Sequence, residues 1–271
     1  MNAAVRGRRA HRYLIWAVSL AALLAGCATT PERGPAPATT LPPLPRDIVS
    51  IPNAVPRFEP RSPHGNPPFY DVDGRRYHVL ASAEGYDATG VASWYGPTFD
   101  GLRTADGDRY DMYAMTAAHK TLPLPCYVRV TNLRNGRSIV VKINDRGPFV
   151  ANRLIDLSYV AAAKLDMLAN GTALVEVQAI TTQSPVITRI AESPPPTLYV
   201  QVGAFAVQSN AARVVARLQA AGFPGAFVFG PPVTRSRLYR VRIGPVNDVP
   251  EFDRLVARLT ALGFSARLVA P

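Results

Sequence analysis

The sequence predicts a mainly β protein: a compact β-barrel in the central part, followed by a smaller α+β domain with βαββαβ order. Three observations support this architecture. Short β-rich segments between Gly90 and Ile180 surround one short helical pattern, which is typical of a small barrel. An internal repeat with an offset of 41 residues follows. Proline accounts for 26 of 271 residues and collects in two clusters that separate these parts.

The N-terminal segment has the pattern of a secretory signal peptide, assigned to residues 1–26. Four arginines precede the apolar run Tyr13–Ala25. The alternative is a single transmembrane helix, but the run is shorter than the about 20 residues that spanning requires. Leu24-Ala25-Gly26-Cys27 resembles a bacterial lipobox, in which Cys27 becomes the lipidated first residue. Ala28 then favours the periplasmic face of the outer membrane. Cys126 then has no disulfide partner, and it is either a nucleophile with an activating histidine nearby or, as we expect, a small buried apolar residue.

Residues 27–68 hold 12 of the prolines and are predicted to be a disordered tether. A second segment, residues 183–196, contains four more and is predicted to be a linker between domains. The barrel domain is assigned to residues 69–182. Its predicted strands are Gly90–Trp94, Cys126–Leu133, Arg137–Ile143 and Ala173–Ile180, with Asn135-Gly136 as a type I′ hairpin turn. Ser158 is predicted to cap a helix that reaches Leu168, with Gly171 beyond its end.

Several polar and aromatic residues of the barrel domain each have two interpretations. Asp145 follows an apolar strand, and it is either a functional carboxyl or a turn residue that bonds its own backbone. His119 is either a site residue or a satisfied core histidine, and Asp108 is either a site residue or a solvated turn acid. Trp94 and Tyr95 belong either to the core or to a platform on which sugars stack.

The order of the motifs in this domain resembles the rare lipoprotein A (RlpA) family of septal peptidoglycan lytic transglycosylases. The motifs are Gly90-Val-Ala-Ser-Trp-Tyr-Gly96, Thr104-Ala-Asp-Gly107, Met115-Thr-Ala-Ala-His119, Thr121-Leu-Pro123, Val130-Thr-Asn-Leu133, Asn144-Asp-Arg-Gly-Pro-Phe149 and Arg153-Leu-Ile-Asp-Leu-Ser158. This resemblance implies a six-stranded double-psi β-barrel. It also places the catalytic acid at Asp145, a supporting acid at Asp108 and the site histidine at His119. The family characteristically has Glu where Asp108 stands.

The chemistry implied by the resemblance is cleavage of the β-1,4 bond between N-acetylmuramic acid and N-acetylglucosamine without water as the nucleophile. An acid protonates the leaving glycosidic oxygen, and the muramic acid 6-hydroxyl closes on the anomeric carbon to give a 1,6-anhydro end. One carboxyl group that serves as acid and then as base must start protonated. We therefore expect burial to raise the pKa of Asp145 and the Arg146 side chain to point away from it. Neither a cofactor nor a metal ion is expected.

The C-terminal domain, assigned to residues 197–271, is built from the internal repeat. Val214–Phe223 corresponds to Leu255–Phe264, so each half predicts strand, helix and strand. Alternation on the strand 238–243 places Leu238, Arg240 and Arg242 on one face, which is either a solvated basic face or a binding surface for a polar polymer. RNA is not expected, because the aromatic pair that stacks bases in similar modules is missing.

Tyr199–Phe205 and Tyr239–Pro245 resemble a sporulation-related (SPOR) domain, with the ferredoxin-like order already predicted. The resemblance implies binding to glycan strands that lack stem peptides and accumulate at the division septum. The positions that match glycan-contacting residues are Gln201, Leu238 and Arg240, with Trp94 and Tyr95 as candidate sugar contacts in the barrel. Ala204 stands where that family has Ser.

The net charge of +11 agrees with this partition rather than with a nucleic-acid partner. Four positive charges lie in residues 1–26 and six in residues 197–271, whereas residues 88–182 are nearly neutral. We therefore expect a lipid-anchored endolytic transglycosylase on the periplasmic face of the outer membrane, enriched at the septum. Two alternatives stay open: a septal glycan-binding lipoprotein without activity, and an expansin-like protein that loosens glycan. Asp at position 108 favours the first of these.

Overall fold

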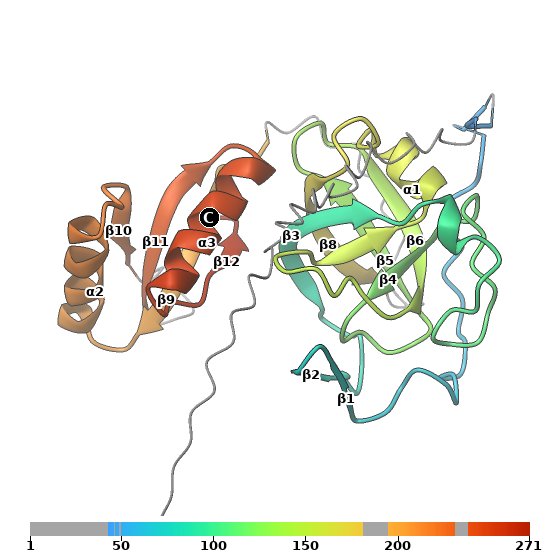
Figure 1. Cartoon of the computed structure of the whole chain (residues 1–271), viewed down its shortest axis with the longest axis horizontal. Coiled ribbons are helices and arrows are strands. Elements are labelled where there is room, and N and C mark those ends of the chain that lie inside the picture. The colour runs from blue at the N-terminus through green and yellow to red at the C-terminus, as the bar shows by residue number, and fades with distance from the viewer. Residues whose placement is uncertain (1–42, 46, 49, 181–194, 231–237) are drawn as a thin grey trace, which may run out of the picture. The chain divides into compact units, whose positions relative to one another are not determined.

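A computed structural model describes residues 43–45, 47–48, 50–180, 195–230 and 238–271 (Figure 1). The predicted signal peptide, Cys27 and most of the predicted linker lie outside the described residues. No helix in the described part of the chain is both long enough and apolar enough to cross a membrane.

Six strands close into a barrel in the order β3-β7-β4-β6-β5-β8, with β8 pairing back to β3. Their bounds are β3 Asp87–Trp94, β4 Thr116–His119, β5 Cys126–Asn132, β6 Ser138–Asp145, β7 Ile155–Leu157 and β8 Ala173–Ile180. The β3–β7 and β4–β6 pairs are parallel, and the other pairs are antiparallel. This is the mixed six-stranded barrel expected from the resemblance. Its interior is filled by aliphatic side chains such as Val128, Val141, Ile143, Ile155 and Leu157.

The four longer strands lie where the sequence predicts them, whereas the short strands β4 and β7 were not predicted. Three or four residues are too few for a period-2 pattern to stand out from an apolar loop. Both missed strands occupy the middle of one wall, where β7 and β4 lie between β3 and β6. This wall carries most of the polar residues considered below.

Two local predictions need correction. The hairpin between β5 and β6 is not a two-residue type I′ turn, because of its central residues only Gly136 has a positive φ (71°). Instead, Gly136 N–H bonds to the Asn132 carbonyl across a four-residue loop. The helix α1 spans only Tyr159–Lys164. Ser158 caps its N-terminus as predicted, but the helix ends before Leu168. The Asn132 side-chain amide donates to the Leu165 carbonyl, and the next residue, Asp166, has a left-handed backbone conformation (φ 59°), so the helix does not continue.

Residues 50–68, called the strap from here on, correct the prediction of a disordered tether that reaches residue 68. The strap has no helix or strand, yet it lies against the barrel. Ala54 N–H donates to the Val140 carbonyl (3.0 Å), and Ser62 N–H donates to the Leu124 carbonyl (2.9 Å). Proline excludes a regular ladder, but the remaining backbone and side-chain groups bond the barrel. A hairpin of β1 (Phe69–Val72) and β2 (Arg75–His78) follows.

The C-terminal domain has one antiparallel sheet, in the order β10-β11-β9-β12, and two helices. The elements are β9 Leu198–Phe205, α2 Gln208–Ala220, β10 Ala226–Phe229, β11 Tyr239–Val246, α3 Val249–Ala261 and β12 Arg267–Val269. This is the predicted βαββαβ order. Gly222 and Gly263 follow the helices with positive φ, as the repeat suggested. Val200, Val241 and Ile243 form the core with the buried helix residues Leu218 and Leu259.

Candidate active site

Asp145 ends β6 at a position where it is partly buried and held by backbone groups. Its Oδ1 accepts hydrogen bonds from Ala105 N–H (2.8 Å) and Arg146 N–H (2.8 Å). Burial raises the pKa of the Asp145 carboxyl and the nearby Asp106 raises it further, while the two backbone bonds and Arg146 act in the opposite direction. The turn interpretation is therefore correct in part, since Arg146 N–H does bond the side chain. A raised pKa favours the protonated carboxyl group, which is the form that a proton donor needs.

The guanidinium of Arg146 points away from Asp145, as predicted. Nε donates to the Gly65 carbonyl (2.8 Å), Nη1 to the His119 and Leu122 carbonyls, and Nη2 to Asn66 Oδ1 (3.2 Å). Two of these acceptors belong to the strap. The partly buried guanidinium is thus satisfied by backbone and amide oxygens, and it does not form a direct ion pair with the Asp145 carboxylate.

His119 has the surroundings of a satisfied core histidine. It is 2% exposed. Its Nδ1 accepts the N–H groups of Thr121 (3.2 Å) and Leu122 (3.1 Å), and its Nε2 lies 2.9 Å from the Tyr86 hydroxyl. Burial, assisted by Lys120 and Arg146, lowers the pKa of His119 to about 3. The imidazole is therefore neutral at pH 7, with its proton on Nε2, and it fixes the loop whose carbonyls bind Arg146.

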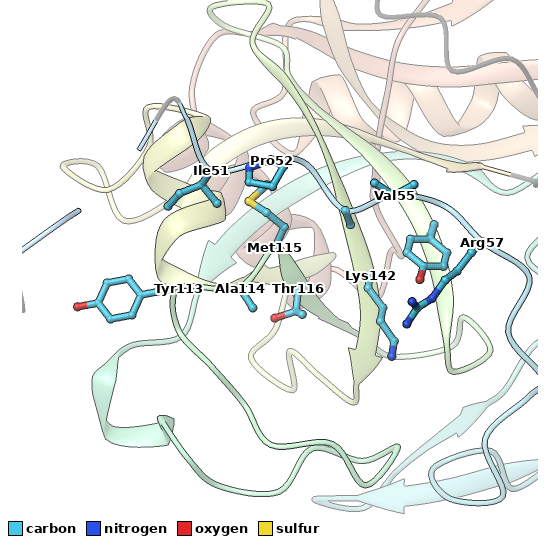
Figure 2. Close-up of a pocket in the computed structure, with 11 residues that line it drawn as sticks. Ile51, Pro52, Val55, Arg57, Tyr113, Ala114, Met115, Thr116 and Lys142 are labelled. Carbon is cyan, nitrogen blue, oxygen red and sulfur yellow. The ribbon is translucent and has the colours of Figure 1, made fainter. Parts of the chain in front are cut away.

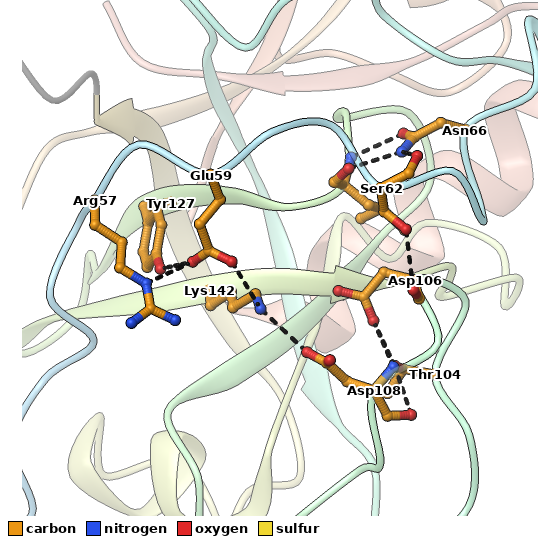
Figure 3. Close-up of polar contacts among 10 residues, drawn as sticks. Arg57, Glu59, Ser62, Asn66, Thr104, Asp106, Asp108, Tyr127 and Lys142 are labelled. Atoms are coloured by element: carbon orange, nitrogen blue, oxygen red, sulfur yellow. Dashed lines mark hydrogen bonds and ion pairs between the residues drawn. The ribbon is translucent and has the colours of Figure 1, made fainter.

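Asp108 lies on the turn between Arg103 and Arg109, with half of its side chain exposed. Its Oδ2 is 3.1 Å from Lys142 Nζ, which is also 3.3 Å from Glu59 Oε2 of the strap (Figure 3). The acid that influences the pKa of Asp145 is Asp106, on the same turn. Sequence reasoning had not singled out Asp106, Glu59 or Lys142, because nothing in a linear pattern indicates that the strap reaches this turn.

A second partly buried carboxyl group, that of Asp156 on β7, was also missed as a site residue. Ser93 Oγ of β3 donates to Asp156 Oδ1. Burial raises the pKa of Asp156 and Asp145 contributes to the rise, whereas Ser93, Lys120 and Arg153 favour the ionised form. The motif that contains this residue was recognised, but the strand β7 that presents it was not predicted.

Trp94 and Tyr95 belong to an aromatic cluster rather than to an open platform. The Trp94 ring lies 5.5 Å from the Tyr159 ring, and the Tyr95 ring lies 4.2 Å from the Tyr110 ring, measured between centroids. The Tyr95 hydroxyl is buried. Within the described residues, neither it nor Thr116 Oγ1 makes a hydrogen bond of normal geometry, although Thr116 is close enough to act on the pKa of Tyr95.

A pocket of about 510 Å³ lies between the strap and the barrel (Figure 2). Its walls are formed by Ile51, Pro52, Ala54, Val55, Arg57, Tyr113, Ala114, Met115, Thr116, Tyr127 and Lys142. Lys142 also touches Asp108, so the pocket borders the carboxylate site. Elsewhere in the barrel, Cys126 packs against the core, and burial raises the pKa of its thiol to about 12, which agrees with the expected apolar role. Among the described residues, no three His, Cys, Asp or Glu side chains form a metal site.

The predicted glycan-binding residues of the C-terminal domain lie along two neighbouring strands. Gln201 pairs in register with Arg242, and Arg240 pairs with Ala204. Leu238, directly before β11, is 39% exposed. Arg242 was expected on a basic face, but it is only 5% exposed, with its guanidinium 4.0 Å above the Phe229 ring. Its Nε and Nη1 have no hydrogen-bond partner in the described part of the chain.

Comparisons with known proteins agree with this architecture. Residues 87–177 match a family model described as "Lytic transglycolase", and residues 194–270 match the SPOR domain model. "Endolytic peptidoglycan transglycosylase RlpA" of Pseudomonas aeruginosa strain UCBPP-PA14 is 39% identical, over 77% of each chain. The Vibrio cholerae protein of the same name is 46% identical, over 60% of this chain and 62% of its own. The crystal structure of the P. aeruginosa RlpA SPOR domain is 35% identical and covers 27% of this chain and 99% of that domain, with a TM-score of 0.24.

Proposed function

Because the chain belongs to the RlpA family of endolytic peptidoglycan transglycosylases, we propose that Asp145 is the catalytic carboxyl with which its barrel cleaves glycan strands. The observation that supports this role is the combination of partial burial, a raised pKa and a site at the end of β6. A carboxyl group that donates a proton near neutral pH needs such an environment. The protein is thus an enzyme of the lytic transglycosylase type that is associated with the cell wall in the periplasm.

The proposed reaction forms 1,6-anhydro ends. Asp145 donates its proton to the glycosidic oxygen as the bond to the anomeric carbon of muramic acid breaks. The 6-hydroxyl oxygen of the same sugar then bonds to that carbon and loses its proton. Once Asp145 is ionised, it is itself able to accept that proton.

The other two predicted site residues have supporting roles in this proposal. Asp108 contributes a charge at the edge of the site, and Lys142 sets its position. His119 acts as a positioning residue. Its Nδ1 holds the loop that supplies two of the carbonyl acceptors for Arg146, and Arg146 directly follows Asp145. A neutral, fully bonded imidazole supports this role better than proton transfer.

The C-terminal domain binds peptidoglycan in this proposal, through the face that carries Gln201, Arg240 and Leu238. Arg242 extends the face, because a buried guanidinium with two unbonded nitrogens is able to donate to sugar oxygens or carboxylates. The preferred strands lack stem peptides and lie at the septum. A lipid anchor at Cys27 on the outer membrane brings enzyme and wall together, which raises the effective concentration of glycan. Lipidation is tested by mass spectrometry of the mature protein.

The decisive experiment is digestion of peptide-free glycan strands, with mass spectrometry of the products. The wild type is expected to release fragments with 1,6-anhydro ends. Asp145→Asn should lower the rate at least about 100-fold and leave glycan binding unchanged. Asp166→Asn is the matched control, because Asp166 is exposed and pairs only with Arg137 among the described residues. Binding by the wild type without such ends would contradict the proposal and favour the non-catalytic alternative, for which the ion-paired Asp108 is the specific argument.

A further inference from the structure

Asp145 and Asp156 flank the same residue from opposite sides. Ala118 on β4 pairs with Asp145 of the parallel strand β6 and with Asp156 of the antiparallel strand β7. Neighbours paired across strands point to the same face of a sheet. The β4–β6 ladder shifts register between Ala117 and Ala118, so it is the shared partner Ala118, and not strict alternation, that brings the two aspartates together. Their Cα atoms are roughly 10 Å apart, which is two strand spacings.

The polar row continues to a fourth strand, since Asp156 also pairs with Ser93 of β3. The Ser93 hydroxyl donates to Asp156 Oδ1. Lys120 and Arg153 supply positive charge at Asp156, and Lys120 Nζ donates to the Arg153 carbonyl. Together with Asp145, these are the charged groups that act on the pKa of Asp156, and burial, the largest cause, raises that pKa overall. Two cations and a hydroxyl donor favour the ionised form of this carboxyl group.

A second observation that points to a ligand at this site comes from two buried hydroxyl groups near the two carboxyl groups. The Tyr95 hydroxyl is almost completely buried, and both Asp145 and Asp156 act on its pKa. It makes no hydrogen bond of normal geometry to any described residue, and neither does the buried Thr116 hydroxyl, although Thr116 is close enough to lower the pKa of Tyr95. Leaving a buried donor unpaired costs about 1–3 kcal/mol. The oxygens of a bound sugar would supply the missing partners.

We propose that Asp156 is a second catalytic carboxyl group, which accepts the proton of the muramic acid 6-hydroxyl while Asp145 donates its proton to the leaving oxygen. The inference rests on the proposed function and divides the two proton transfers between two groups. The C1–O4 bond breaks with its electron pair on O4, which takes the proton of Asp145. The O6 lone pair forms the C1–O6 bond, and the O6 proton passes to Asp156. Exchange of one proton with solvent restores the starting state.

The test compares the full chain with Asp156→Asn, using Asp166→Asn as the control. Initial rates of 1,6-anhydro end formation are measured from pH 4 to 9, together with glycan co-sedimentation. We expect Asp156→Asn to lower the maximal rate at least about 100-fold with binding unchanged. The wild type should show a bell-shaped pH profile, whose acid limb reports the ionisation of Asp156. A rate within tenfold of the wild type would overturn the inference and leave the proposed function intact. A wild type without product would instead overturn the proposed function and this inference with it.

Ser93→Ala provides a second measurement that does not depend on the folding of Asp156→Asn. It keeps the carboxyl group and removes the donor that favours its anion. The acid limb of the pH profile should therefore move to higher pH, and the alkaline limb should not move. Ser138→Ala is the control, because Ser138 bonds only Thr131 among the described side chains. An acid limb that stays in place in Ser93→Ala would contradict the role of Asp156.

Discussion

The Lys142 ammonium lies 3.1 Å from the Asp108 carboxylate, on the rim of the strap pocket. The same ammonium pairs with Glu59, so the strap shares the cation that holds Asp108 (Figure 3). The resemblance described above implies Glu in place of Asp108, and here the shorter side chain meets a lysine whose charge is already partly neutralised by Glu59. This geometry makes the length of the side chain at position 108 testable.

Asp108→Glu should therefore increase the rate of 1,6-anhydro end formation. The longer side chain extends the carboxylate by one methylene, and placement errors of about 1 Å are able to cost up to about 100-fold in rate. We expect an increase of about tenfold at saturating glycan. Asp111→Glu, a change at an exposed acid on the following turn, serves as the control. An unchanged or lower rate in Asp108→Glu would show that the shorter acid is sufficient.

The strap should contribute directly to the stability of the barrel. Asn66 Oδ1 accepts from Leu124 N–H (2.9 Å) and Arg146 Nη2 (3.2 Å), and its amide donates to the Leu124 carbonyl (2.7 Å). Asn66→Ala removes the acceptor of Leu124 N–H and Arg146 Nη2 and should lower the free energy of unfolding by about 1–3 kcal/mol. Urea unfolding measures this change. Asn53→Ala, at an exposed position of the same strap, should have almost no effect. Equal effects of the two variants would contradict this account.

His119 should make folding sensitive to acid. Its pKa is about 3 in the folded protein, against an ordinary value of 6.5, so the unfolded chain binds a proton that the folded chain does not. Stability from this residue is complete above pH 6.5 and is lost as the pH falls toward 3. In His119→Asn, whose Oδ1 is able to accept from the same N–H groups, the free energy of unfolding should depend less on pH between 6.5 and 4. Parallel curves for variant and wild type would refute the assignment.

Asp145 should destabilise the folded protein at neutral pH. Its pKa is raised on folding, so the folded state holds its proton more tightly and stability falls as the pH rises above the unfolded value near 4. Asp145→Asn, which keeps an acceptor for the two backbone N–H groups, should therefore melt at a higher temperature than the wild type at pH 7. The difference should vanish near pH 3. A lower melting temperature at pH 7 would mean that the carboxylate is stabilised by its surroundings.

Substitution of Arg242 should affect glycan binding and the stability of the C-terminal domain in different ways. Burial lowers the pKa of this arginine, and two of its nitrogens have no partner among the described residues, so the charge is costly to the fold. Arg242→Met should leave the melting temperature unchanged or higher, and it should weaken glycan co-sedimentation about tenfold. Arg213→Met, on the exposed side of α2, should alter neither. Full glycan binding by Arg242→Met would remove Arg242 from the binding face.

Local patterns were sufficient to predict the long strands, the order of the C-terminal elements and the Ser158 cap. They also placed Asp145 at the end of an apolar strand. They were not sufficient for the strands β4 and β7, which are short and have no alternation of their own. Asp156 was missed as a site residue because it lies on the short strand β7. Its partners come from β3, from β4 and from the loops beside them, which are distant in the sequence. The neutral state of His119 was also beyond a linear pattern, since it depends on burial and on two backbone donors.

The packed strap limits how far the enzyme is able to travel from its proposed anchor. If the tether extended to residue 68, the 41 residues from Cys27 would allow a distance of up to about 145 Å. Because Ala54 N–H is bonded to the Val140 carbonyl, only 26 residues lie between Cys27 and this backbone-to-backbone hydrogen bond. Fully extended, these residues span about 95 Å at most. The barrel would therefore work in a layer of the periplasm at least one third thinner than the proline content suggests, because Leu44, Ile48 and Ile51 also pack against the barrel domain.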